Sequence, residues 1–153
     1  PFLKKYGILI EACPISNQML GLVVDQRNHP IGQMLRHAHS TGNAISPKLV
    51  QLLQHNPELK DMFDNFVRPP LLAVSINNDD PGFWGIDGIV SYDWYVAVLA
   101  WDLNIGAIKQ LAIDSIVHSA APQKQRATQL KQWKEMWEQW IKDVGRMAVH
   151  EYK

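Results

Sequence analysis

Two short apolar runs in the chain have the pattern of buried β-strands. They cover residues 8–13 and 70–78, and each is rich in leucine, isoleucine or valine. Turn residues close both runs, since Pro14 follows the first and Asp79-Asp80-Pro81 follows the second. Short apolar runs bounded in this way are typical of strands buried on both faces. Helical patterns separate and follow the two runs, so the chain is predicted to have a helix-rich α/β fold.

The pattern predicts helices at 18–25, 30–37, 48–54, 58–66, 92–103, 105–119 and 122–145. Asn28, Ser91 and Asn104 stand where a polar side chain caps the first turn of a helix. The last helix has one apolar face, which consists of Leu130, Trp133, Trp137, Trp140, Ile141 and Val144. Such a face usually packs against the rest of the fold, and the alternative is a surface for a partner or a second copy.

The composition excludes several classes of protein. The chain has 153 residues with 15 acidic and 15 basic side chains, and a formal charge of zero gives no support for nucleic-acid binding. No apolar run approaches the ~20 residues of a membrane-spanning helix, and no targeting segment is visible, because the first residues lack the apolar stretch of a signal peptide. The absence of an initiator Met indicates a processed, cleaved or partial polypeptide. The single cysteine, Cys13, cannot form an intrachain disulfide, and we expect a buried and unreactive thiol.

Two adjacent carboxylates, Asp79 and Asp80, directly follow the second predicted strand. Like charges in a low-dielectric site repel one another and lose hydration, so this pair is costly unless something compensates it. A cation beside one carboxylate and a donor group of a ligand beside the other would do so, and ligands of α/β folds bind at the carboxyl ends of strands. The alternative is an ordinary turn in which both side chains accept from nearby backbone N–H groups.

Three motifs occur in a specific order: Cys-Pro-Ile-Ser-Asn-Gln at 13–18, Arg-Asn-His-Pro at 27–30, and Asp-Asp-Pro at 79–81. The last of these, with its surroundings at 77–85 and 91–95, resembles the final catalytic strand of the adenosine deaminases. The first two, with residues 108–116 and the tryptophan-rich last helix, resemble the adenosine deaminase-related growth factors within that family. The resemblance runs from about Gly7 to Gly145 and lapses between His37 and Pro69.

The resemblance implies the fold of a metal-dependent hydrolase built on a (β/α)8 barrel. Such a barrel usually takes ~250 residues. A chain of 153 residues with two convincing strands therefore cannot close one by itself. We expect residues 1–153 to form the C-terminal part of one barrel domain, from about the seventh strand to the terminal helices. Residues 38–69 are expected to be a helical insertion in the loop before the last strand.

The resemblance also implies a reaction, the zinc-dependent hydrolytic deamination of adenosine to inosine. Zinc makes water a nucleophile at neutral pH because it lowers the pKa of a bound water from ~15.7 to about 7. Asp79 matches the catalytic carboxylate that ligates zinc and orients the water, and Asp80 matches the carboxylate that hydrogen-bonds N7 of the purine. Trp84 is a candidate for stacking on the purine, and its alternative role is core packing.

The other zinc ligands and the catalytic glutamate of the family, which lie in His-x-His and other histidine motifs, have no match in this chain. A catalytic zinc site typically has three protein ligands, so the chain alone is expected to bind zinc poorly and to be inactive. His37-Ala38-His39 imitates one motif, but positions two apart on a helix do not share a face. We expect these two histidines to be solvated and His29 to stabilise a turn.

Two rival interpretations stay open. A split or degenerate deaminase would be a non-catalytic structural subunit of a larger assembly, although the retained aspartate pair argues against that role. An AMP or adenine deaminase would have much the same pair. The resemblance further implies secretion, adenosine as the substrate, the remainder of the barrel as a partner, and often a homodimer, whereas no residue pattern indicates a nucleic acid or a membrane as a partner.

Overall fold

The computed structural model describes residues 3, 6–40, 47–56, 72–83, 85 and 90–151. In this part of the chain two short parallel strands pair, β1 (Ile10–Ala12) and β2 (Val74–Ile76). Ile10 lies opposite Val74 and Ala12 opposite Ile76. All three residues of β2 are buried, which confirms the predicted buried strand, although both strands are shorter than the apolar runs that predicted them.

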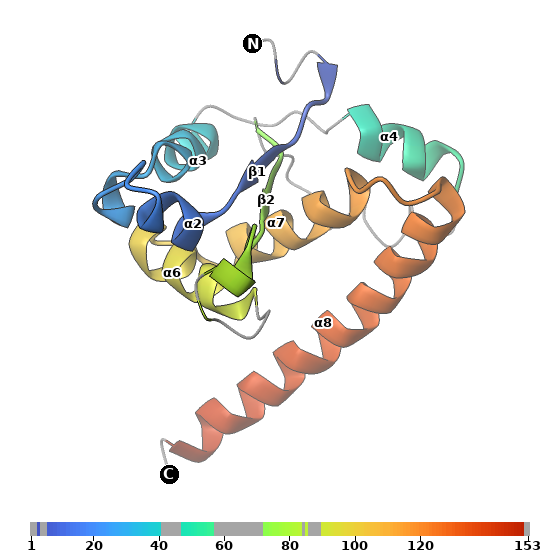
Figure 1. Ribbon diagram of the computed structural model, residues 1–153. Helices are drawn as coiled ribbons and strands as arrows, with labels where there is room; N and C mark the ends of the chain where they lie inside the picture. The colour runs from blue at the N-terminus through green and yellow to red at the C-terminus, as the bar shows by residue number, and fades with distance from the viewer. Residues whose placement is uncertain are drawn as a thin grey trace.

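Helices surround the strand pair and make up most of the fold (Figure 1). They are α2 (Pro14–Met19), α3 (Pro30–Ser40), α4 (Pro47–Gln54), α6 (Ser91–Trp101), α7 (Ile105–Val117) and α8 (Gln123–Glu151), with short 3-10 turns at η1 (Gln26–Asn28) and η2 (Pro81–Phe83). Helix α7 packs along β2, and α6 contacts α2, η1 and α3. None of the described helices is long and apolar enough to cross a bilayer.

Several boundaries differ from the sequence-based predictions. The predicted helix at 18–25 is wrong for most of its length, because α2 spans Pro14–Met19 and begins at a proline, which is well suited to the first position of a helix. Helix α8 continues past Gly145 to Glu151. Asn104 caps α7 as predicted, since its Oδ1 accepts a hydrogen bond from the backbone N–H of Ala107 at 2.9 Å. The predicted helix at 58–66, and with it most of the predicted insertion at 38–69, lies outside the described residues.

Two other predicted caps are wrong. Helix α3 is capped by His29 and not by Asn28, because Nδ1 of His29 accepts a hydrogen bond from the backbone N–H of Ile31 at 3.1 Å. Helix α6 includes Ser91 as its first residue and has no side-chain cap at Val90. Helix α3 therefore begins at Pro30 as predicted but with a different capping residue, whereas α6 begins one residue before its predicted start.

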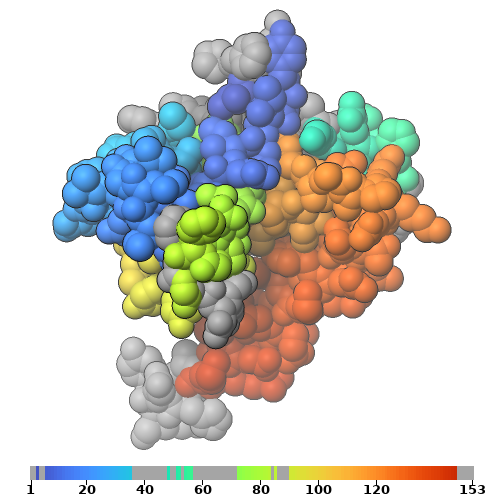
Figure 2. Space-filling view, in the orientation of Figure 1, coloured from blue at the N-terminus to red at the C-terminus, as the bar shows by residue number. Residues whose placement is uncertain are grey.

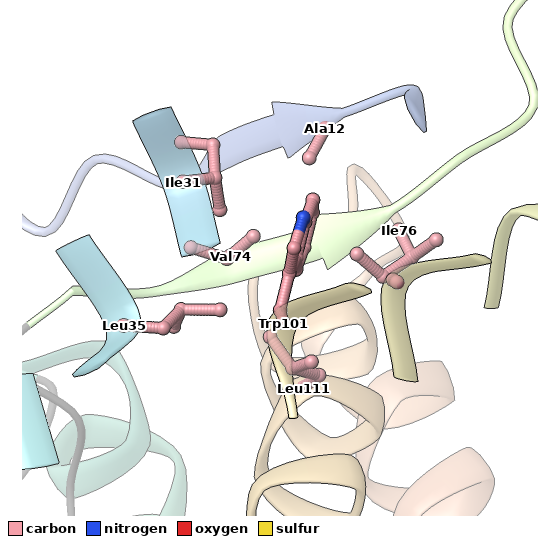
Figure 3. Close-up of a cluster of buried hydrophobic side chains, with 8 residues drawn as sticks. Ala12, Ile31, Leu35, Val74, Ile76, Trp101 and Leu111 are labelled. Atoms are coloured by element: carbon pink, nitrogen blue, oxygen red, sulfur yellow. The ribbon is translucent and has the colours of Figure 1, made fainter. Parts of the chain in front are cut away.

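The main core cluster lies between the strand pair and the helices on one side of it (Figure 3). Trp101 from α6 is 1% exposed and reaches across the sheet face, with Leu111 of α7 next to it. The cluster is completed by apolar residues of both strands and of α3 and α6, which are Ala12, Val74, Ile76, Ile31, Leu35 and Ala97. Burial of these side chains holds α3, α6 and α7 on the strands whose carboxyl ends carry the candidate site.

The tryptophan face of α8 packs against the fold only in its first half. Leu130 is fully buried and Trp133 packs beside it, in a second cluster with Ile113 and Val117 of α7. Farther along the helix, Trp140 is 44% exposed and α8 runs away from the strands (Figure 1). The packing interpretation is therefore confirmed for the first half of the face, whereas Trp140 contacts Trp137 of its own helix and is exposed in the described part of the chain.

Candidate functional site

The site is built where the two strands end, because parallel neighbours bring their carboxyl ends to the same edge. Cys13 follows β1 directly, and Asp79 follows β2 after two asparagines. The two chain segments are joined there by a hydrogen bond in which the Ser16 hydroxyl donates to Oδ2 of Asp79 at 2.8 Å. Figure 2 shows the green segment that contains Asp79 at the surface, beside the blue amino-terminal residues.

The backbone turns sharply at the aspartate pair. Strand β2 ends at Ile76, Asp79 has a positive φ of 56°, and η2 begins at Pro81. A positive φ is uncommon for a residue with a side chain, and it lets consecutive residues leave the strict alternation of a strand. Asp79 and Asp80 therefore need not point to opposite faces, as adjacent residues of a regular strand do, and the two carboxylates can serve one site.

Both carboxylates are exposed in this chain, so the burial cost anticipated from the strand pattern is not present. The hydrogen bond that the structure gives the Asp79 side chain comes from a hydroxyl of another element and not from a backbone N–H group of its own turn. This contact favours a positioned carboxylate over the ordinary-turn interpretation of Asp79.

Cys13 lies among acidic groups at this edge. Burial first, and then the negative charges of Asp79, Asp93 and Glu11, raise the pKa of its thiol to about 11. The thiol therefore stays protonated at neutral pH, which agrees with the expectation that it is not a nucleophile. Its side chain is half-buried rather than fully buried as expected.

Three more hydrogen bonds hold the segment that carries Ser16. Oδ1 of Asp93, at the start of α6, accepts from the backbone N–H of Ile15 at 2.9 Å. Gln26 donates to the carbonyl oxygen of Pro14 at 2.6 Å, and the ring of His29 bonds Oδ1 of Asn17 at 2.9 Å. Burial raises the pKa of Asp93 and lowers that of His29.

The predicted structural role of His29 is confirmed. Its Nδ1 accepts from Ile31, so Nε2 carries the proton and donates to Asn17, and the ring packs on Trp101 with centroids 4.9 Å apart. Trp84 lies outside the described residues, and so do the side chains of His37 and His39. Their predicted roles in purine stacking and at a solvated helix end stay predictions.

Ser16 and Asp93 contribute to the site but were not identified as site residues from the sequence. One signal was available in the sequence. The motif that contains Ser16 begins where β1 ends, and β1 is the neighbour of β2, the strand that precedes Asp79. From its position alone, Asp93 is only a favourable negative charge in the first turn of α6. Its hydrogen bond to Ile15 spans 78 positions along the chain, and a local sequence pattern cannot predict a contact between such distant residues.

The described residues contain no group of three or more His, Cys, Asp or Glu side chains that could hold a metal ion. Asp79 does fit the role of one ligand, because it is exposed, lies at a strand's carboxyl end, and has one carboxylate oxygen held by Ser16. Carboxylates that ligate metals are typically oriented by such hydrogen bonds. The described residues are thus suited to contribute one ligand to a metal site whose other ligands come from elsewhere.

Comparison with known proteins gives a consistent set of relatives. The chain is 32% identical over 144 residues to adenosine deaminase 2 of Pongo abelii, and 31% identical over the same length to adenosine deaminase 2 of Homo sapiens and to an adenosine deaminase of Phlebotomus duboscqi. Each alignment covers 92% of this chain and 22% of the relative. The chain thus spans about a fifth of the length of these curated relatives. No family model matches it.

Proposed function

The chain belongs to the adenosine deaminase family, and on that premise we propose that it supplies the C-terminal part of the active site of a zinc-dependent adenosine deaminase. The reaction would convert adenosine and water to inosine and ammonia. The observation that carries the proposal is the placement of Asp79 at the carboxyl end of β2, held by Ser16 from the end of β1. That is the edge of a parallel sheet at which α/β enzymes bind their ligands.

In this proposal Asp79 is a zinc ligand and the catalytic carboxylate. Zinc, when bound, supplies the acidity that makes water a nucleophile at neutral pH. Because Ser16 occupies Oδ2, the other oxygen of Asp79 is available to a cation. The remaining ligands and the general acid/base would come from polypeptide outside these 153 residues, and this chain alone would be inactive.

Asp80 is proposed to hydrogen-bond the purine at N7, and Trp84 to line the substrate pocket. The turn at Asp79, with its positive φ, supports the first assignment because it frees the second carboxylate from the alternation of a strand. With Asp79 as a metal ligand, the segment 79–84 would then contact both the metal ion and the purine base.

The parallel pair of β1 and β2, with long helical connections around it, supports the proposal that the chain is part of a (β/α)8 barrel. The main partner would then be the remainder of that barrel. Secretion and homodimer formation are proposed from the family resemblance alone. The relatives named adenosine deaminase favour adenosine over AMP or adenine as the substrate.

A non-catalytic deaminase-like subunit is the second candidate. The observation that favours it is that the described residues include no cluster of three potential metal ligands. The two candidates differ in whether Asp79 holds zinc in the complete protein that carries this sequence.

The deciding experiment is Asp79→Ala in that protein, with zinc content measured by elemental analysis and deamination measured as inosine formed. Loss of a zinc ligand should lower zinc affinity by more than the ~10–100-fold that is typical when a residue that hydrogen-bonds a ligand is replaced. Asp102→Ala is the matched control, because Asp102 is also exposed and has a positive φ of 53° but lies at the far end of α6. Equal zinc content and turnover in the two variants would refute the ligand assignment.

A further inference from the structure

Four consecutive residues of α2 are each held by a different residue outside the helix, and these partners come from three segments of the chain. The partners follow one another along residues 14–17, and they are Gln26 on Pro14, Asp93 on Ile15, Asp79 on Ser16 and His29 on Asn17. A helix of six residues is not stable by itself, because too few hydrogen bonds compensate for its nucleation. The first turn of α2 is therefore placed by its tertiary partners.

Ser16 is the residue of this turn that reaches the candidate site. It is fully buried, and its hydroxyl donates to Asp79 across 63 positions of sequence. A hydrogen bond to a charged carboxylate is stronger and more directional than one between neutral groups. The contact therefore fixes the orientation of a side chain that is otherwise exposed.

The backbone of Asp79 also leaves the extended conformation of the strand, with a φ of 56° in the left-handed region. Aspartate visits this region more readily than most L-residues, and Asp102 at the end of α6 has a similar φ of 53°. What distinguishes Asp79 is the hydrogen bond that its carboxylate receives from Ser16 of another element, which sets the direction of the side chain.

We propose that Ser16 is a positioning residue that orients the Asp79 carboxylate toward a metal ion. Asp93 holds Ser16 in place by accepting a hydrogen bond from the backbone N–H of the preceding residue, Ile15. This proposal rests on the proposed function of Asp79. The contacts run from α6 through the first turn of α2 to the carboxyl end of β2. They consist of the 2.9 Å bond from the Ile15 N–H to Asp93 and the 2.8 Å bond from the Ser16 hydroxyl to Asp79. They also account for the co-occurrence of the Cys-Pro-Ile-Ser-Asn-Gln motif with the aspartate pair.

The test measures zinc affinity by competition with a chromophoric chelator, in the complete protein that carries this sequence. We expect Ser16→Ala to weaken zinc binding by about 10–100-fold, the loss typical when a side chain that hydrogen-bonds a metal ligand is removed. Asp93→Asn keeps an acceptor for the Ile15 N–H group and should bind zinc within about 3-fold of the wild type, whereas Asp93→Ala should behave like Ser16→Ala. Melting temperatures of the zinc-free proteins are measured alongside.

Ser119→Ala is the control for loss of a hydroxyl, because the Ser119 hydroxyl donates to the carbonyl oxygen of Ile116, at the end of its own helix, at 2.9 Å. It should leave zinc affinity unchanged. If Ser16→Ala binds zinc as tightly as Ser119→Ala while Asp79→Ala has lost it, the positioning role is refuted and the proposed function stands. If Asp79→Ala also keeps its zinc, both are refuted. A fall in melting temperature of Ser16→Ala with no change in zinc affinity would make Ser16 a purely structural residue.

Discussion

Replacing Gly32 with alanine would place a methyl group inside the main core cluster. Gly32 lies in the first turn of α3, directly against the indole of Trp101 on α6. A Cβ atom at this position would lie 2.7 Å from Cδ1 and 2.8 Å from Cγ of that ring. Carbon atoms in contact prefer about 3.5–4.0 Å, so either the helix or the ring has to move.

The ring has little room to do so. Trp101 is 1% exposed, its Nε1–H donates to the carbonyl oxygen of Gln26 at 3.0 Å, and its face packs on His29. Overpacking of this kind costs about 1–3 kcal/mol, and weakening the hydrogen bond to Gln26 costs about 1 kcal/mol more. Alanine regains about 1 kcal/mol over glycine as a helix former. The net expectation is a loss of about 1–3 kcal/mol in the free energy of unfolding.

Thermal unfolding followed by far-UV circular dichroism measures this loss, and for a protein of this size it should lower Tm by about 2–12 °C. Gly145→Ala is the matched control, since Gly145 lies within α8 and no atom would approach its added Cβ within 4 Å. At that position only the higher helix propensity of alanine matters, so the free energy of unfolding should rise by about 0.5–1 kcal/mol. If both variants stabilise the protein, the close approach of α3 to Trp101 is wrong.

Two further predictions follow from single contacts. Asn104→Ala should destabilise the protein by about 1 kcal/mol, because the bond to the Ala107 N–H is lost, whereas Asn104→Asp should retain most of it in the same melting assay. Burial raises the pKa of Asp114 from 3.8 to about 7, so the folded state holds a proton that the unfolded chain releases near pH 4. The stability that this group contributes is complete below about pH 4 and is lost as the pH rises to about 7, by up to about 4 kcal/mol. Asp114→Asn should therefore gain stability relative to the wild type across that range in denaturant titrations, and a constant difference between the two would refute the shifted pKa.

Local sequence was sufficient for the elements whose signals are local. The run around Val74 predicted a buried strand because its apolar side chains are continuous, and Asn104 predicted a helix start because its own side chain bonds a backbone N–H three residues away. The aspartate pair was noticed for a similar reason, since two charges after an apolar run are conspicuous in the sequence alone.

The sequence was less reliable where neighbouring signals compete. The local sequence favoured Asn28 as the cap of α3, whereas the observed cap is His29, whose ring is also held by its bond to Asn17 and its packing on Trp101. Helix α8 continues past Gly145 because one glycine costs only about 1 kcal/mol, which is too little to end a long helix.

What the chain determined by itself, then, is its class of elements and the identity of the acidic pair, because these depend on residue type and on spacing over a few positions; its family is known from the resemblance of its motifs and from its relatives. The support of Asp79 was decided only by the tertiary structure. Ser16 and Asp93 lie 63 and 78 positions from the groups they bond, and such contacts exist only once the two strands pair and α6 packs against α2. Packing of distant segments sets the direction of a carboxylate, whereas sequence spacing sets only its position along the chain.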